Sequence, residues 1–223
     1  MDLYQYFLTQ NGRNILKFPH YFPIYERHFS KFVDHPITMF EIGTGEGGSC
    51  QMWKYYFGPT ARIVTIDIHN KKAFEESQIY VRTGSQADPN FLQELVAEFG
   101  APDIVLDDGS HMMEHINVSF DVLCPRMSPK GVYLVEDLDG AYWKVRGGGL
   151  RNPNSFVERC KNLVDELNAD FTGGAVTKSP MGEYLFSISF YQMLIVLEKT
   201  PYMNRTMTRL PKALQPAPIK PAP

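Results

Sequence analysis

The sequence predicts an α/β fold: a doubly wound, mostly parallel seven-stranded sheet with helices on both faces and a C-terminal antiparallel hairpin. Three observations lead to this prediction. Between residues 38 and 135, short apolar runs alternate with longer amphipathic stretches, as in repeated strand–helix units. Several of these runs are followed directly by glycine or acidic residues. Parallel sheets bind their ligands at the carboxyl ends of the strands, which is where these residues fall. Two late runs, 184–191 and 194–198, lie too close for a helical crossover and therefore form a hairpin.

The composition limits the possible functions. The 223 residues suffice for one large α/β domain, and 43% hydrophobic with 21% charged residues is ordinary for a globular protein. A formal net charge of -3 gives no general attraction to nucleic acid, and no apolar run approaches the ~20 residues of a membrane span. The first residues lack the pattern of a signal peptide. Cys50, Cys124 and Cys160 are odd in number and far apart, which favours a reducing cytoplasm over a disulfide framework.

We expect three regions along the chain. Residues 1–36 form an N-terminal helical cap, residues 37–200 form the central domain, and residues 201–223 form a Pro-rich tail. The cap is dense in aromatic residues, and two interpretations are open. The aromatic side chains either pack on the sheet or form a subunit contact or a wall of the substrate site.

The individual elements follow from local patterns. One helix has well-marked ends, because Asp88 and Pro89 open it and the Gly-Ala-Pro run at 100–102 ends it. Besides the hairpin, strands are expected at 38–42, 61–68, 78–81, 103–106 and 131–135, and helices at 49–56, 71–77, 90–99, 111–123 and 154–167.

A glycine-rich loop follows the first strand and opens a helix. Gly43, Gly45 and Gly48 fit the pattern G-x-G-x-x-G, and Gly47 in place of Gly48 gives G-x-G-x-G. Glycines at these places let the backbone turn tightly and approach a ligand. The motif alone does not distinguish a dinucleotide from S-adenosylmethionine, and a glycine turn without a ligand is the plain alternative.

Polar residues after the next two strands suit the rest of an adenosyl group. Asp67 ends the second strand, where a carboxylate can accept hydrogen bonds from both ribose hydroxyls. Ser85 and Gln86 follow the third strand, where an adenine ring lies in this topology. The structural alternatives are a helix N-cap for Asp67 and loop contacts for the other two residues.

Four acids end the fourth and fifth strands: Asp107 and Asp108, then Glu136 and Asp137. If these strands are neighbours, their ends lie roughly 5 Å apart and the carboxylates repel one another. No lysine or arginine occurs in either motif, so a bound cation is the simpler compensation. Oxygen ligands suit Mg²⁺, Mn²⁺ or Ca²⁺ better than zinc. Solvated acids that cap helices are the alternative.

His111 follows Asp108 by three residues and is a candidate general base beside the metal. With His115 it also matches the inverted zinc-protease pattern H-x-x-E-H. We disfavour that interpretation, because five residues make a frequent accidental match and the surrounding sequence predicts a cofactor-binding sheet. A structural hydrogen bond is the expected role of His115.

Taken together, these motifs resemble class I S-adenosylmethionine-dependent methyltransferases. More narrowly, the chain resembles the metal-dependent sugar O-methyltransferases of the mycinamicin type, which act on macrolides and rhamnosyl glycosides, and their polysaccharide-modifying relatives. The resemblance covers residues 20–199 in order, and its most specific parts are D-D-G-S-H and E-D. The motifs lie at 41–49, 52–53, 66–68, 84–86, 106–111 and 135–137.

The resemblance implies a Rossmann-like methyltransferase fold and a role for each motif. By that resemblance Asp108, Glu136 and Asp137 hold Mg²⁺ or Mn²⁺. His111 is then the base, and His111 and Asp108 are the expected catalytic residues. The residues expected to bind S-adenosylmethionine are Glu41, Gly43, Gly45, Gly47, Asp67, Ser85, Gln86 and Asp107.

The expected function is transfer of a methyl group from S-adenosylmethionine to a sugar hydroxyl of a glycoside or saccharide, by a cytoplasmic homodimer. A catechol-type O-methyltransferase is an alternative that shares the cofactor and the metal. A nicotinamide-dependent oxidoreductase is another, although no Tyr-x-x-x-Lys pair occurs and the acidic cluster would be unexplained. A third is an adenosyl-binding protein without catalytic activity.

Overall fold

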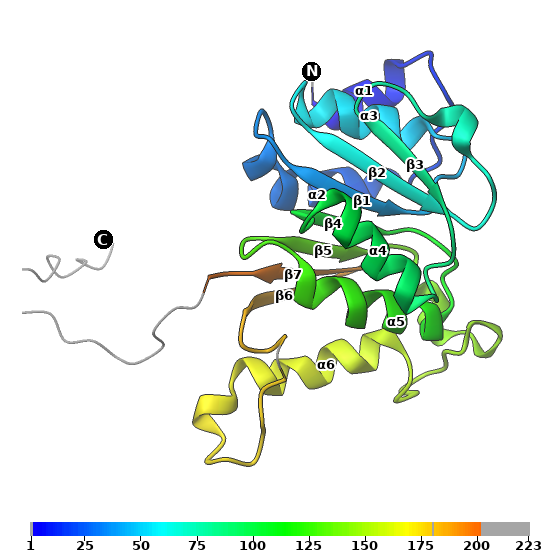
Figure 1. Cartoon of the computed structure of the whole chain (residues 1–223). Coiled ribbons are helices and arrows are strands. Elements are labelled where there is room, and N and C mark those ends of the chain that lie inside the picture. Colours follow the sequence, from blue (N-terminus) through cyan, green and yellow to red (C-terminus); the bar gives the residue numbers. More distant parts are fainter. Residues whose placement is uncertain (1, 180, 202–223) are drawn as a thin grey trace, which may run out of the picture.

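The computed structural model, which describes residues 2–179 and 181–201, contains one seven-stranded sheet in the order β3-β2-β1-β4-β5-β7-β6 (Figure 1). The first five strands are parallel, and β7 runs antiparallel to both of its neighbours. The predicted fold class is confirmed. The strands are β1 (Thr38–Ile42), β2 (Arg62–Asp67), β3 (Ile79–Thr83), β4 (Ile104–Asp107), β5 (Val132–Val135), β6 (Leu185–Tyr191) and β7 (Leu194–Lys199).

Six α-helices and several 3-10 turns connect these strands within the described residues. The helices are α1 (Leu3–Thr9), α2 (Phe22–Phe29), α3 (Gly48–Phe57), α4 (Pro89–Phe99), α5 (Met113–Leu123) and α6 (Phe156–Leu167). The turns are η1 (Pro19–Tyr21), η2 (Ser30–Phe32), η3 (Lys72–Phe74), η4 (Cys124–Arg126), η5 (Leu138–Tyr142), η6 (Lys144–Arg146) and η7 (Ala169–Phe171). Apart from its first residue, the expected Pro-rich tail lies outside the described residues.

Several element boundaries differ from the sequence prediction. The expected helix at 71–77 is only the turn η3, so that prediction was wrong. Helix α5 begins two residues late because His111 has a φ of 56°, which a right-handed helix does not allow. Helix α6 also begins late, because Ser155 caps it and accepts a hydrogen bond from the Glu158 amide at 3.3 Å.

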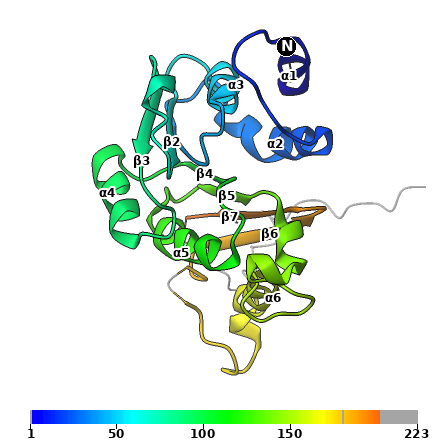
Figure 2. The ribbon, with the colours of Figure 1, turned by 90° about the vertical axis from the view of Figure 1, so that its right-hand side faces the viewer.

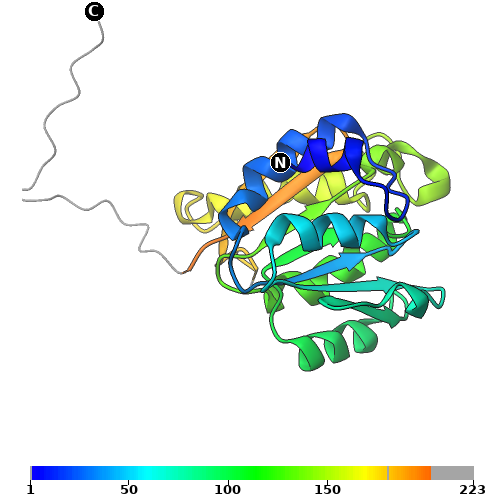
Figure 3. The same cartoon turned by 90° about the horizontal axis from the view of Figure 1, so that it is seen from above.

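The helices form two layers, one on each face of the sheet (Figures 2 and 3). Helices α1, α2 and α3 pack on one face with strand residues such as Met39 and Ile104. Helices α4, α5 and α6 pack on the other face with residues such as Phe40 and Val105. Because both faces are covered, the central strands read as continuous apolar runs rather than as alternating patterns.

Aromatic rings join helix α2 to helix α3. Trp53 of α3 is fully buried, and its ring makes edge contacts with Tyr25 and Phe29 of α2 at centroid distances of 5.1 and 5.7 Å. It also stacks with Phe57 at 6.0 Å. Much of the aromatic density seen in the N-terminal sequence therefore belongs to the core of this face.

The carboxyl ends of the parallel strands meet at one edge of the sheet, where the chain order reverses between β1 and β4. The loops after these strands are tied to the sheet, since the Gly43 amide donates to the Ile66 carbonyl at 2.8 Å and the Asp108 amide to the Ile42 carbonyl at 2.9 Å. Ligands of open α/β sheets bind at such a reversal point. No helix among the described residues has both the length and the apolar character needed to cross a membrane.

Glu198 of β7 ties the outer strands to the N-terminal helices. Its carboxylate accepts hydrogen bonds from Lys31 Nζ at 3.0 Å and Ser187 Oγ at 3.1 Å, and lies 3.6 Å from His28 Nδ1. The nearby His28 imidazole, aided by the hydrogen bonds from Lys31 and Ser187, outweighs the opposing effect of burial and lowers the pKa of Glu198 to about 2.

We expect Glu198→Gln to lower the free energy of unfolding by roughly 1–2 kcal/mol near neutral pH. A carboxyl whose pKa is depressed on folding stabilises the fold above its unfolded pKa, here 4.5. This contribution is lost as the pH falls toward the folded value of about 2. Urea unfolding at several pH values measures it. Glu94→Gln, at an exposed position on α4, is the control. The difference in free energy of unfolding between wild type and Glu198→Gln should shrink in acid. A difference that stays constant would contradict the lowered pKa of Glu198.

Candidate active site

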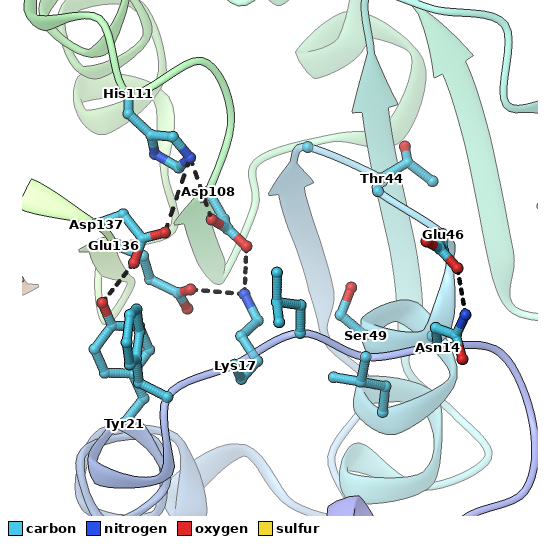
Figure 4. Close-up of a pocket in the computed structure, with 16 residues that line it drawn as sticks. Asn14, Lys17, Tyr21, Thr44, Glu46, Ser49, Asp108, His111, Glu136 and Asp137 are labelled. Atoms are coloured by element: carbon cyan, nitrogen blue, oxygen red, sulfur yellow. Dashed lines mark hydrogen bonds and ion pairs between the residues drawn. The ribbon is translucent and has the colours of Figure 1, made fainter. Parts of the chain in front are cut away.

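A cavity of about 740 Å³ lies at the carboxyl edge of the sheet. Four segments form its walls: residues 14–18 with Tyr21, the glycine loop after β1, the loop after β4 and the loop after β5 (Figure 4). A second cavity of about 180 Å³ adjoins it and shares Gly43. Among its lining residues are Asp67, Ser85, Gln86 and His115. The two cavities together have the size of a typical small-molecule site.

The glycine loop is held between the loop after β4 and the N-terminal segment. Gly43 has a φ of +97°, and a Cβ added there would collide with the carbonyl oxygen of Asp108. A Cβ on Gly48 would collide with the carbonyl oxygen of Asn14. Gly45 has a φ of +53° with open space around it and lines the larger cavity. The loop therefore needs glycine for close approach at Gly43 and for backbone conformation at Gly45.

Three residues predicted to bind the cofactor lie behind the cavity walls. Glu41, Gly47 and Asp107 do not line either cavity in the described part of the chain. Glu41 is fully buried, and its carboxylate accepts hydrogen bonds from Trp53 Nε1 and Cys50 Sγ, both at 3.1 Å. Burial raises the pKa of Glu41 and outweighs the opposing charge of Lys17.

Asp107 orients Gln86 through its buried carboxylate. Its buried carboxylate accepts hydrogen bonds from Ser119 Oγ at 2.6 Å and from Gln86 Nε2 at 3.1 and 3.2 Å. Burial raises the pKa of Asp107. Gln86 Oε1 in turn accepts a hydrogen bond from the Ser110 amide at 2.7 Å. Asp107 thus fixes a residue that lines the smaller cavity and steadies the loop after β4.

Asp108, His111 and Asp137 converge at the larger cavity. His111 Nε2 lies 4.0 Å from Asp108 Oδ1 and 3.9 Å from Asp137 Oδ2, and one donor atom from each residue falls within 4.8 Å of the others. His111 and Asp137 both adopt left-handed backbone conformations, with φ of 56° and 53°. Such strain occurs where the surrounding structure dictates side-chain direction. Two carboxylates and an imidazole suit a divalent cation.

Glu136, the third predicted metal ligand, has other partners in this structure. Its side chain is buried, and it accepts hydrogen bonds from Lys17 Nζ at 2.6 Å and from Tyr25 OH at 2.5 Å. Lys17 Nζ also donates to Asp108 Oδ2 at 2.5 Å (Figure 4). The prediction that a bound cation compensates the acids was thus incomplete, because a distant lysine supplies one positive charge.

Burial and charge shift the pKa values of Lys17 and Glu136 in opposite directions. Burial alone would lower the pKa of Lys17, but the charges of Asp108 and then Glu136 outweigh it, so the pKa of Lys17 is raised. Burial raises the pKa of Glu136 to about 8 against the opposing charge of Lys17. Lys17 is therefore a protonated, positively charged neighbour of Asp108.

Sequence reasoning missed Lys17, and it gave the aromatic residues Tyr21 and Tyr25 no polar role at the site. Tyr21 OH donates to Asp137 Oδ1 at 2.5 Å, so two tyrosine hydroxyls reach the acids from one face of the N-terminal helices. Their spacing of four residues was a usable signal for a shared helix face. Lys17 stands alone in the apolar run Ile15–Leu16–Lys17–Phe18, and nothing local predicts its partners.

His115 lies apart from the metal candidates. Its Nδ1 is 2.9 Å from Ser110 Oγ, and it lines the smaller cavity rather than joining Asp108, His111 and Asp137. The geometry of the described residues thus gives no support to a zinc site built on the H-x-x-E-H pattern. Arg146 Nη1 donates to the Ser110 carbonyl at 2.9 Å and fixes the same loop from the other side.

We expect Gly43→Ala and Gly45→Ala to differ sharply in stability. The Cβ of an alanine at position 43 would collide with the Asp108 backbone, and its positive φ adds strain. The free energy of unfolding should therefore fall by roughly 3–5 kcal/mol. Alanine at position 45 has space and bears only the positive φ, so the loss should be about 1 kcal/mol. Urea unfolding of both variants checks this. Equal losses would mean that the loop does not press against Asp108.

No protein-family model matches the chain. The mycinamicin VI 2''-O-methyltransferase of Micromonospora griseorubida is 40% identical over 195 residues, which are 82% of this chain and 49% of the relative. The demethylmacrocin O-methyltransferase of Streptomyces fradiae is 36% identical over 193 residues, 81% of this chain and 49% of the relative. The chain thus spans about half the length of the curated relatives it matches.

A solved structure agrees with these relatives. The MycE methyltransferase of the mycinamycin biosynthetic pathway, in complex with Mg, SAH and mycinamycin VI, superposes with a TM-score of 0.77 at 30% identity. The match covers 89% of this chain and 52% of MycE. The resemblance noted in the sequence is confirmed: the chain is a homologue of the sugar O-methyltransferases of the macrolide and tetracenomycin pathways, over about half of their length.

Proposed function

We propose that this protein is a metal-dependent O-methyltransferase that transfers a methyl group from S-adenosylmethionine to a hydroxyl of a saccharide or glycoside. One observation carries the proposal: Asp108, His111 and Asp137 converge beside a cavity lined by Gly43 and Gly45. The names of the relatives, which include 2''-O-methylation of mycinamicin VI, support the sugar acceptor.

The two adjoining cavities suit the two ends of the methyl donor. The methionine end would lie in the larger cavity against the glycine loop, and Glu41 would hold helix α3, which follows that loop. The adenosyl end would lie in the smaller cavity, with the ribose near Asp67 and the adenine near Ser85 and Gln86. Because Gly43 lines both cavities, one elongated molecule can occupy them together.

The acids fit a divalent cation, Mg²⁺ or Mn²⁺. We propose that Asp108 and Asp137 hold it beside His111, while Glu136 stays bonded to Lys17 and Tyr25. When bound, the cation would act as a Lewis acid and a template for the acceptor hydroxyl.

We propose that His111 acts as the base. Its Nε2 lies beyond hydrogen-bond distance from both carboxylates and faces the cavity, so it can accept a proton from an acceptor hydroxyl. As the hydroxyl oxygen bonds to the methyl carbon, the carbon–sulfur bond breaks and the sulfonium becomes a neutral thioether. The hydroxyl proton passes to His111 and then to solvent.

We also propose that the protein acts in the cytoplasm as a homodimer. Cys50, Cys124 and Cys160 are free, buried thiols, which supports a reducing compartment. Light scattering of the purified protein measures the assembly.

The function is tested with labelled S-adenosylmethionine and a panel of rhamnosides, macrolide glycosides and oligosaccharides. We expect methylation of a sugar acceptor, loss of turnover in excess EDTA, and recovery with Mg²⁺ or Mn²⁺, because the acids need the cation to position the acceptor. Calorimetry should show binding of S-adenosylhomocysteine.

Each alternative function gives a different result in the same assays. Full activity in EDTA would exclude the metal role. Methylation of catechols alone would favour a catechol-type enzyme. Binding of NAD in place of S-adenosylhomocysteine would favour an oxidoreductase. Donor binding without any transfer would indicate a non-catalytic protein.

We expect His111→Ala to lower kcat by about 10²–10⁴-fold, because the hydroxyl proton loses its acceptor. Affinity for S-adenosylhomocysteine should change much less than kcat, because His111 lines only the larger cavity and the adenosyl end would bind in the smaller one. Single-turnover methyl transfer and calorimetry measure the two quantities. His35→Ala, at an exposed position before β1, is the control and should be fully active. Near-normal turnover of His111→Ala at high Mg²⁺ would make the role of His111 structural instead.

A further inference from the structure

Residues 13–18, which we call the strap, cross over the glycine loop at the larger cavity (Figure 4). At one end, Arg13 Nη1 donates to the Phe74 carbonyl at 2.8 Å, and Arg13 Nη2 lies 3.2 Å from Glu76 Oε2. Next to Arg13, Asn14 Nδ2 donates to Glu46 Oε2 at 2.6 Å. The strap therefore closes one side of the cavity in which we place the methionine end of the donor.

Lys17 anchors the other end of the strap, and its burial is unusual. Its side chain is 2% exposed, whereas the neighbouring Leu16 is 96% exposed. The chain thus buries a charged side chain and leaves an apolar one in water, the reverse of the ordinary preference. The hydrogen-bonded ion pairs of Lys17 therefore hold this end of the strap, beside the ring contact of Phe18 with Tyr21 at 5.4 Å.

The two oxygens of Asp108 face different partners. Oδ2 accepts the hydrogen bond from Lys17, and Oδ1 faces His111. The place beside Asp137 is therefore open to a cation while Lys17 stays bound. The lysine and a cation can therefore lie on opposite sides of the Asp108 carboxylate at the same time.

We infer that Lys17 is a positioning residue that couples donor binding to the acid cluster, by fixing the strap to Asp108 and Glu136. The inference rests on the proposed function for the identity of the donor. The contrary account is that Lys17 only fills the place of the metal and leaves when the metal binds. The two accounts differ in what the metal does to the strap.

The test uses the full chain with Lys17→Met, which keeps the length of the side chain and removes its charge. We expect the Kd for S-adenosylhomocysteine, measured by calorimetry, to rise at least about 10-fold. The KM for S-adenosylmethionine should rise more than kcat falls, and backbone hydrogen exchange in residues 13–18 should become faster. The affinity for Mn²⁺, measured by electron paramagnetic resonance, should stay equal or rise, because a repelling charge is removed.

Lys199→Met is the matched control. Lys199 is also a buried lysine, but its Nζ donates to the carbonyl oxygens of Cys124 and Met127 at 3.0 and 3.1 Å, with no contact to the acids. Its loss should lower the melting temperature and leave the affinity for S-adenosylhomocysteine unchanged.

Two results would overturn the inference. One is a folded Lys17→Met variant that binds S-adenosylhomocysteine as wild type does. The other is faster exchange of residues 13–18 in wild type on addition of Mn²⁺, since this would show that the metal displaces Lys17. If wild type itself binds no S-adenosylhomocysteine, the proposed function fails instead.

Arg13→Met provides a second route if Lys17→Met does not fold. This variant loosens the strap from the end that lies away from the acids. We expect the Kd for S-adenosylhomocysteine to rise several-fold, and an unchanged Kd would overturn the inference equally.

Discussion

Crowding of negative charge at the ends of β4 and β5 is the constraint around which the site is arranged. The strands are neighbours in register, with Asp107 opposite Val135, so Asp108 and Glu136 follow side by side. Carboxylates held this close repel one another unless positive charge or hydrogen-bond donors surround them. The N-terminal segment provides both, through the ammonium of Lys17 and the hydroxyls of Tyr21 and Tyr25.

Core packing and site geometry depend on the same helix. The ring of Tyr25 packs against Trp53, and its hydroxyl donates to Glu136. Trp53 in turn donates to Glu41 below the glycine loop. A shift of α2 on the sheet would therefore move donors at two places at once. The N-terminal aromatic residues therefore both pack in the core and donate hydrogen bonds to the acids of the site.

The sequence predicts the elements whose signals are local. The sheet, the hairpin and the convergence of Asp108, His111 and Asp137 follow from strand patterns, because parallel strands bring their ends together. Lys17 was missed because its partners lie 91 and 119 residues away, and no local pattern encodes that distance. The helix expected at 71–77 does not form, because the backbone is extended at Glu75 and the Glu76 backbone exchanges hydrogen bonds with Ile79 instead.

The position of Lys17, Tyr21 and Tyr25 ahead of β1 has a consequence for recombination between relatives. A chimera joined at Thr38 would inherit all seven strands yet combine acids from one parent with hydrogen-bond donors from the other. The first 37 residues and the loops after β4 and β5 thus have to match each other within one protein. A functional chimera should therefore take residues 1–37 and the loops after β4 and β5 from the same parent. A graft of the glycine loop alone would separate this loop from the strap that crosses it.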